Sequence, residues 1–222
     1  MFESFFGILT FFATILVLVT GVFVIGISLL TRHFMRAGRI GLILLGWIAV
    51  YAVILLTASF TSQPRYLSIG QERCFDEMCY SVTAVTITPT LTNDFLYQLK
   101  ARGNFYLVTV QLRNAARREA QKPSNPDLFV IGAGGKIYSS YIDMRASGGW
   151  GAPTNLPGLV LPLWDQKIQP GETSSLTVAF DLPVDIRQPG LVVTEGIGPL
   201  SVAIIGDENS LFHAKTEFQL IP

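Results

Sequence analysis

Two cysteines, Cys74 and Cys79, are the residues of this 222-residue chain best suited to chemistry, and they stand close together in the stretch CFDEMC. Such a pair could bind a metal, form a redox couple or close a structural disulfide. Zinc commonly takes about four Cys and His ligands, but the two histidines, His33 and His213, are far from the pair in sequence. Redox pairs are more typically spaced C-x-x-C at the start of a helix. The sequence therefore predicts a structural disulfide.

This spacing requires a tight turn between the cysteines. Five extended residues would separate the two Cα atoms by about 17 Å, whereas a disulfide joins Cα atoms at most about 7 Å apart. Residues 75–78 must then reverse direction, which places Asp76 and Glu77 at an exposed tip. Their carboxylates could bind calcium, but that ion needs about 6–8 oxygens, so we expect solvated turn residues. Closing this small ring should contribute about 2 kcal/mol to stability.

Two long apolar segments dominate the first sixty residues. Residues 5–30 (FFGILTFFATILVLVTGVFVIGISLL) and 40–60 (IGLILLGWIAVYAVILLTASF) contain no Asp, Glu, Lys, Arg or His. A helix of about 20 apolar residues crosses a bilayer, and two segments of this length make buried core helices a poorer explanation. A signal peptide would have a basic start and a shorter apolar stretch, which the opening MFES does not provide. We expect a transmembrane helical hairpin, residues 1–62, that stays in the mature protein.

The connection between the two apolar segments, residues 31–39, carries Arg32, Arg36 and Arg39. Short connections rich in Lys and Arg stay in the cytoplasm. The arginines could instead bind anionic lipid headgroups, but topology explains so small a group better. We therefore expect a two-span protein of the cell membrane with a cytoplasmic loop over residues 31–39. Both termini and the distal domain would lie outside the cytoplasm, where cysteines pair.

Small residues predict that the two spans pack closely, because they let helix backbones approach each other in lipid. Gly46, Ala49 and Ala52 recur three apart in the second span, and Gly21 and Ser28 lie on one side of the first.

The lack of charged residues in the spans argues against a transporter or a channel. Charged groups inside a span usually mark ion or proton paths, and neither span has one. Trp47 and Tyr51 lie one turn apart inside the second span, where we expect them to be packing groups.

The distal part, residues 63–222, has the pattern of an all-β domain. Apolar and polar residues alternate in segments bounded by turn residues, which is typical of strands with one buried face. We predict an antiparallel β-sandwich. The predicted strands are residues 80–88, 105–113, 128–131, 136–142, 174–182, 191–194, 200–205 and 217–221, with Pro89 ending the first. The predicted inward-facing residues of two of them are Tyr106, Val108, Val110, Leu112, Leu176, Val178, Phe180 and Leu182.

Three motifs of this domain occur in a recognisable order. The strand FYLVTVQLRN ends in Asn114, the turn GGKIY covers residues 134–138, and the turn PGE at residues 170–172 precedes TSSLTVAFDLP. This arrangement resembles the telokin-like, immunoglobulin-related domains of bacterial surface proteins and lipoproteins, over roughly residues 66–182. The resemblance implies an extracytoplasmic sandwich and brings no catalytic residues with it.

A long Gly- and Pro-rich connection, residues 145–162, interrupts the strand pattern. Loops of this length are often functional. Trp150 within it and Trp164 just beyond are candidate contacts for a partner or for the bilayer interface. Alternatively, Trp150 fills the open end of the sandwich, because Trp is highly buried on average.

The basic residues offer little for binding anions. Arg113, Arg117, Arg118 and Lys122 gather near one predicted hairpin end, where we expect a solvated turn rather than a phosphate site. The formal net charge is zero and no basic stripe is present, which argues against nucleic acid as a partner.

The sequence shows no signature of catalysis. It contains no G-x-S-x-G, no H-E-x-x-H, no P-loop and no dinucleotide-binding glycine pattern, so we expect no enzyme, no metal and no cofactor. The favoured function is a membrane-anchored extracytoplasmic binding or structural module that recognises a protein or envelope component. Its partners would be the lipid bilayer and another envelope or membrane protein. The alternative is an accessory subunit of a membrane protein complex, contacted mainly through the helical hairpin; an extracytoplasmic hydrolase is less favoured.

Overall fold

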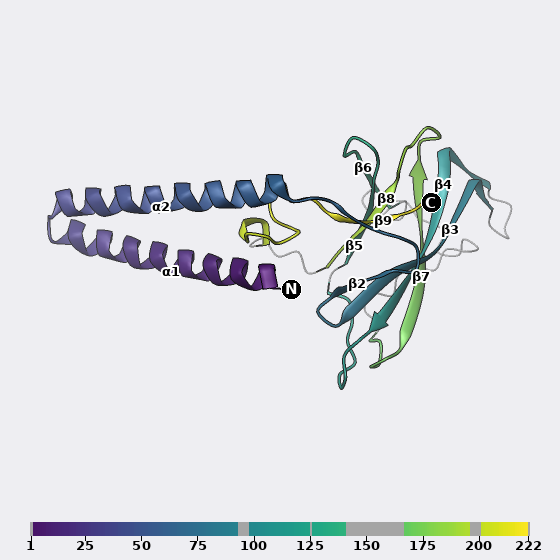
Figure 1. Cartoon of the computed structure of the whole chain (residues 1–222), viewed down its shortest axis with the longest axis horizontal. Coiled ribbons are helices and arrows are strands. Elements are labelled where there is room, and N and C mark those ends of the chain that lie inside the picture. The colour runs from purple at the N-terminus through teal and green to yellow at the C-terminus, as the bar shows by residue number, and fades with distance from the viewer. Residues whose placement is uncertain (1, 93–97, 125, 141–166, 196–200, 222) are drawn as a thin grey trace. The chain divides into compact units, whose positions relative to one another are not determined.

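The structure, a computed structural model, describes residues 2–92, 98–124, 126–140, 167–195 and 201–221 (Figure 1). The chain divides into two compact units. One contains Met1–Pro64 and Ile197–Lys215, and the other contains Arg65–Gly196 and Thr216–Pro222. The sequence placed everything after residue 62 in one domain, whereas the structure groups residues 197–215 with the helices.

The first unit is built on two long helices, α1 (Phe2–Leu30) and α2 (Phe34–Thr61). By length and composition both could cross a membrane. Because α2 already begins at Phe34, the non-helical connection covers only residues 31–33 of the loop expected over residues 31–39. Arg32 lies in this connection with a φ of 59°, and Arg36 and Arg39 lie in the first turns of α2.

The packed face of α1 has a period of seven residues. Its buried and half-buried positions are Gly7, Phe11, Thr14, Leu18, Gly21, Ile25 and Ser28, and Gly26 beside them is also half-buried. Spacings of alternately four and three residues are those of coiled-coil packing, and every second position of this face carries a small residue, as close approach in lipid requires. The two helices therefore pack through a narrow stripe, and the rest of each helix surface is left exposed.

Close packing occurs where the sequence predicted it in α1, but not throughout α2. A Cβ atom at Gly21 would lie 2.6 Å from the side chain of Leu44, so only glycine fits there without movement. Ser28 is also buried. Gly46, in contrast, faces open space and Ala49 is exposed, so their predicted packing role is wrong. The Trp47 indole does reach across the pair, donating from Nε1 to Thr14 Oγ1 at 3.4 Å.

The second unit is a β-sandwich with two sheets. Its strands are β1 (Arg65–Leu67), β2 (Glu72–Phe75), β3 (Met78–Thr92), β4 (Gln98–Asn114), β5 (Asp127–Ile131), β6 (Ile137–Ser139), β7 (Thr173–Leu182), β8 (Gly190–Thr194) and β9 (Thr216–Gln219). One sheet has the order β1-β9-β8-β5-β6 and the other β2-β3-β4-β7. All pairs between these strands are antiparallel except β1 with β9, which is parallel. The prediction of purely antiparallel sheets is therefore wrong at this edge, where a long intervening chain permits a parallel pair.

Most of the predicted strands are present, but one was predicted where none forms and two were missed. The strand predicted over residues 200–205 is wrong, because residues 201–203 form a short 3-10 turn, η1 (Ser201–Ala203). The short strands β1 and β2 were not predicted, since three or four residues show too little alternation to stand out.

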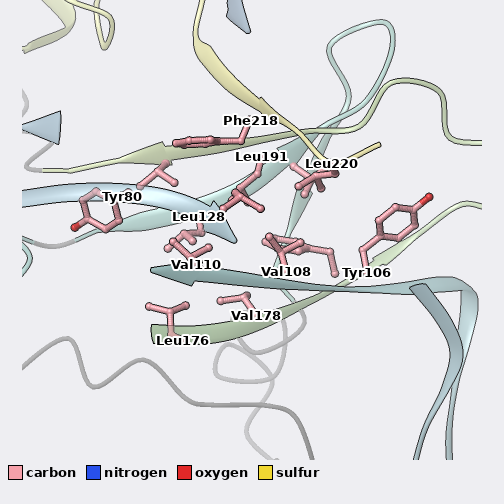
Figure 2. Close-up of a cluster of buried hydrophobic side chains, with 14 of the residues drawn as sticks. Tyr80, Tyr106, Val108, Val110, Leu128, Leu176, Val178, Leu191, Phe218 and Leu220 are labelled. Carbon is pink, nitrogen blue, oxygen red and sulfur yellow. The ribbon is translucent and has the colours of Figure 1, made fainter. Parts of the chain in front are cut away.

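The core lies between the two sheets, as Figure 2 shows. The predicted inward faces of β4 and β7 are confirmed: all eight of their residues belong to this core. Tyr80 of β3 lies in this core with Leu191 and Phe218 of the opposite sheet, and all three are fully buried. Burying a large apolar side chain contributes about 1.5–3 kcal/mol, so this core supplies the main stabilisation of the sandwich.

Pro89 does not end β3, contrary to expectation. The strand continues to Thr92 through a register shift between Thr88 and Thr90, so the missing N–H of Pro89 falls where no ladder bond is required. On the facing strand, the extra residues of β4 are held by Asp181 of β7, whose carboxylate accepts the backbone N–H groups of Arg102 (3.0 Å) and Gly103 (3.1 Å).

Candidate functional site

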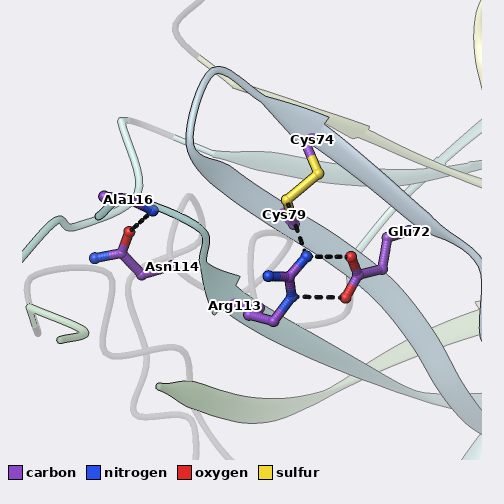
Figure 3. Close-up of a disulfide and its surroundings, with 6 residues drawn as sticks. All are labelled: Glu72, Cys74, Cys79, Arg113, Asn114 and Ala116. Atoms are coloured by element: carbon purple, nitrogen blue, oxygen red, sulfur yellow. Dashed lines mark hydrogen bonds and ion pairs between the residues drawn. A yellow bond between two sulfur atoms is a disulfide. The ribbon is translucent and has the colours of Figure 1, made fainter. Parts of the chain in front are cut away.

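The disulfide predicted between Cys74 and Cys79 is present and joins directly opposite residues of β2 and β3 (Figure 3). The two strands reverse through a two-residue turn at Asp76 and Glu77, which are both exposed, as predicted. Asp76 has a φ of 50°, a left-handed conformation that Asp adopts more readily than most residues. The acidic pair therefore serves the geometry of the turn.

A bidentate ion pair lies beside the disulfide. Arg113 of β4 donates from Nε to Glu72 Oε1 at 2.9 Å and from Nη2 to Glu72 Oε2 at 2.6 Å. The same Nη2 lies 3.8 Å from Cys79 Sγ. The hydrogen bonds from Arg113 hold the pKa of Glu72 below its usual range. Because each side chain remains 37% exposed, the ion pair contributes little to the stability of the fold. Its main effect is to fix the positions of the two side chains.

The disulfide also limits which metals Glu72, Cys74 and Cys79 could bind. Glu72, Cys74 and Cys79 each offer a possible ligand atom, and these atoms lie within 4.8 Å of one another. Sulfur binds zinc as a thiolate, and two sulfurs joined in a disulfide have no thiolate form. The trio could hold a soft metal only after reduction, and a structural zinc site would still need about one further ligand.

Asn114 ties together the loops at this end of the sandwich. Its side chain is fully buried and makes three hydrogen bonds. Nδ2 donates to the carbonyl of Glu119 (2.9 Å) and to that of Ile168 (2.8 Å), and Oδ1 accepts the N–H of Ala116 (2.8 Å; Figure 3). A buried amide with all these bonds made fixes the connection after β4 in one conformation.

The same asparagine contacts the PGE turn through its backbone. Gly171, with a φ of 78°, donates to the Asn114 carbonyl at 2.8 Å, and the Asn114 N–H donates to Glu172 at 3.1 Å. Two of the three sequence motifs are therefore parts of one junction. The third serves a separate turn, where Lys136 lies over the ring of Tyr138 at 5.2 Å.

The basic cluster does not act as a unit. Arg113 is engaged by Glu72, whereas Arg117, Arg118 and Lys122 are exposed on the connection that follows β4. An anion site built on all four, the less favoured alternative of the sequence, would need to break the ion pair first.

A buried polar group between the sheets was missed by sequence reasoning. Tyr80 is fully buried, and within the described part of the chain neither its hydroxyl nor Glu195 Oε2 has a hydrogen-bond partner. Burial raises the pKa of Glu195, although the N–H of Ser124 acts in the opposite direction. Burial, and next the charge of Glu195, raise the pKa of Tyr80. Nothing in the local sequence pairs these two residues, because they lie on different sheets.

Arg73 links the two sheets beside this group. From β2 it donates through Nη1 to the carbonyls of Val193 (3.0 Å) and Thr216 (3.4 Å), and its guanidinium lies 4.3 Å from the ring centroid of Phe75. Arg73 therefore has a structural role, because it connects the two sheets.

The remaining residues singled out in the sequence are two tryptophans and the distal histidine. Trp150, Trp164 and the connection over residues 145–162 lie outside the described residues. His213, the distal histidine, has its Nδ1 2.8 Å from the carbonyl of Ala214. The described surface around the disulfide thus contains an ion pair, a closed turn and exposed basic side chains.

No protein-family model matches the chain. No curated protein sequence matches it significantly. Among solved structures the chain is similar to an uncharacterized β-sandwich protein from Clostridium difficile, with 12% identity, a TM-score of 0.41, and 72% of this chain and 96% of that one covered. It is also similar to the yjhA protein of Bacillus subtilis (8% identity, TM-score 0.42, 71% and 99% covered). A third similar structure is the secreted protein MPT63 of Mycobacterium tuberculosis (16% identity, TM-score 0.38, 63% and 94% covered).

Proposed function

We propose that the protein is a membrane-anchored module whose β-sandwich, of the immunoglobulin or telokin-like class, lies outside the cytoplasm and binds a protein or another envelope component. The helical hairpin of α1 and α2 is the anchor. The lipid bilayer and an envelope or membrane protein are its partners.

The observation that carries this proposal is the exposed apolar surface of the two helices. Large side chains such as Phe23, Leu42 and Leu45 are 68%, 70% and 63% exposed, and they surround a packed stripe that takes up a minor part of each helix. An apolar surface of this extent is unstable in water. In a bilayer it is the required surface, because lipid tails are as apolar as these side chains.

The charges at one end of the hairpin support an orientation. Arg32, Arg36 and Arg39 are exposed within eight residues of one another, at the connection and in the first turns of α2. Since basic residues near short connections are retained in the cytoplasm, both termini would be on the opposite side. The Cys74–Cys79 disulfide supports the same placement of the sandwich, because such bonds persist in oxidising compartments.

Crosslinking in native membranes, followed by mass spectrometry, shows which of the two units contacts the partner. One variant has scrambled apolar residues in both spans but keeps their lengths and the three arginines. The reciprocal variant keeps the hairpin and replaces the sandwich by an unrelated folded domain. We expect the crosslinked partner to be recovered with the scrambled spans and lost with the replaced sandwich. The opposite result would overturn the binding module and support the accessory subunit of a membrane complex.

A further inference from the structure

Residues 201–215, here named the capping segment, form a folded loop within the helical unit. The N–H of Leu211 donates to the Val202 carbonyl at 3.1 Å, which closes the loop. Inside it, Asp207 Oδ1 accepts the N–H of Asn209 at 2.7 Å. The ammonium group of Lys215 donates to the carbonyl of Glu208. These polar groups of the segment therefore form hydrogen bonds within the segment itself.

The capping segment is fixed to the helix ends by specific bonds. The Tyr51 hydroxyl donates to the Ala203 carbonyl at 2.7 Å, and the N–H of Ala214 donates to Ser62 Oγ at 2.8 Å. The hydroxyls of Ser59 and Ser210, both buried, lie 3.4 Å apart. These contacts involve the end of α2 that is remote from the three arginines, as Figure 1 shows for the helices and this loop.

The segment also contacts α1 closely. A Cβ atom at Gly7 would lie 1.9 Å from the carbonyl oxygen of Ile205, so any larger residue would displace this backbone. Gly7 is one of the small residues on the packed stripe of α1. The packed stripe of α1 therefore contacts α2 at Gly21 and the capping segment at Gly7.

The exposed side chains of the segment are all apolar. Val202, Leu211 and Phe212 are 46%, 49% and 62% exposed, whereas every other residue of the segment is half-buried or buried. The Phe212 ring stacks on Phe60 of α2, with centroids 5.3 Å apart and an interplanar angle of 13°. Phe60 is itself 69% exposed. The apolar surface of the segment is therefore continuous with the exposed apolar surface of the helix.

The backbone of Phe212 supports a specific role for its ring. Its φ of 62° lies in the left-handed region, which is a costly conformation for a bulky residue. Such outliers persist where the surrounding structure holds them and point to function. Here the conformation places a large ring at the surface beside Phe60, where a soluble loop would gain nothing from it.

We propose that the capping segment is a third membrane contact, which inserts Val202, Leu211 and Phe212 into the extracytoplasmic boundary between lipid headgroups and acyl chains. The proposal rests on the membrane anchor proposed above. Its occupant is lipid because the patch joins the surface that the helices offer to the acyl chains. Phe and Leu side chains form the apolar face of segments that bind at this boundary.

Site-directed spin labelling tests this insertion in the full-length protein, reconstituted in phosphatidylcholine–phosphatidylglycerol liposomes. Single labels are placed at Leu211→Cys and, as an independent second position, at Val202→Cys. The native cysteines are occupied by their disulfide. Leu45→Cys on α2 is the control for the anchor, and Val184→Cys, 76% exposed on the sandwich, is the control for water. Collision rates with oxygen and with a water-soluble nickel chelate report whether each label lies in lipid or in water.

We expect the ratio of oxygen to nickel collisions at positions 202 and 211 to be several-fold higher than at position 184 and lower than at position 45, which lies near the middle of α2. Water-like values at 202 and 211 with a lipid value at 45 would overturn the insertion and leave the anchor intact. Low collision rates with both reagents at 202 and 211 would assign the patch to a protein contact and also overturn it. A water-like value at position 45 would refute the anchor itself.

Discussion

The two units of this protein place the same kinds of residues in opposite surroundings. In the sandwich, Val108, Phe180 and Phe218 are fully buried. In the helical unit, comparable side chains such as Phe12 (61% exposed) and Leu16 (68%) lie on the surface. Water forces apolar groups inward and lipid does not, so the difference is the one expected if the helical unit is the membrane anchor proposed above.

Polar groups are buried in both units. In the helices, the hydroxyl groups of Thr14, Ser28 and Ser59 lie at buried positions; Thr14 accepts from Trp47 of α2, and Ser59 lies against Ser210 of the capping segment. In the sandwich, the ion pair of Glu72 and Arg113 is at the surface. The deeply buried Asn114 there is fully hydrogen-bonded. Each of the following predictions tests one side of this comparison.

The largest expected effect is in the core of the sandwich. Phe180→Ala should lower the free energy of unfolding by about 3–5 kcal/mol, because it removes a fully buried ring and leaves a cavity. Urea unfolding of the reconstituted protein, followed by circular dichroism in the β region, measures it. Phe23→Ala, which removes an exposed ring of α1, is the matched control. A loss of equal size in that control would contradict the distinction between the two units.

A positive charge should affect the two exposed surfaces differently. Leu45→Lys places an ammonium group near the middle of α2 and should disfavour membrane insertion by about 3 kcal/mol. Val184→Lys, at an equally exposed position of the sandwich, should change stability by less than about 0.5 kcal/mol. The fraction of protein resistant to alkaline extraction from membranes measures the first effect. If both variants stay fully inserted, the surface of α2 does not face acyl chains.

Asn114→Ala should destabilise the sandwich by about 2–3 kcal/mol, because it leaves two carbonyls and one N–H without the side-chain bonds they make now. Thr83→Ala, which removes one exposed hydrogen bond of 3.3 Å, should cost less than about 0.5 kcal/mol. Equal effects in chemical denaturation would mean that the junction at Asn114 is not a stabilising element.

The smallest effect is a dependence of stability on pH. The pKa of Glu195 is raised in the folded state by burial, so its contribution is fully present below the unfolded pKa and is lost as the pH rises through the folded pKa. Glu195→Gln should therefore make the sandwich more stable at neutral pH and flatten this decline.

Glu72→Gln is the control of opposite sign. Arg113 lowers the pKa of Glu72, so this contribution is present above the unfolded pKa and is lost as the pH falls through the folded pKa. The variant should be less stable than the native protein at neutral pH and equal to it in acid. Thermal unfolding from pH 3 to 8 measures both variants, and a shift of the same sign in both would contradict the assignment.

Local patterns in the sequence predicted much of the architecture. Alternation identified β4 and β7 together with their buried faces, because a strand with one wet face repeats every two residues. The disulfide and its exposed turn followed from the short reach of four intervening residues. The absence of charge over long stretches identified α1 and α2.

Features that depend on distant residues could not be predicted. The ion pair of Glu72 with Arg113 joins strands that are separated by another strand in the sheet, and Tyr80 meets Glu195 only when the two sheets pack. A strand was predicted over residues 200–205, yet residues 201–203 form a 3-10 turn, and the Ala203 carbonyl accepts its hydrogen bond from Tyr51 of α2. No local pattern contains that information.

The most direct test of the membrane anchor is labelling from one side. Single cysteines at Thr31→Cys, in the connection between the helices, and at Val184→Cys, in the sandwich, are exposed to a membrane-impermeant maleimide in right-side-out membrane vesicles. We expect Val184→Cys to react at once and Thr31→Cys to react only after the membrane is permeabilised. Immediate labelling at Thr31→Cys together with protection at Val184→Cys would contradict the orientation, and immediate labelling at both would contradict the two-span anchor.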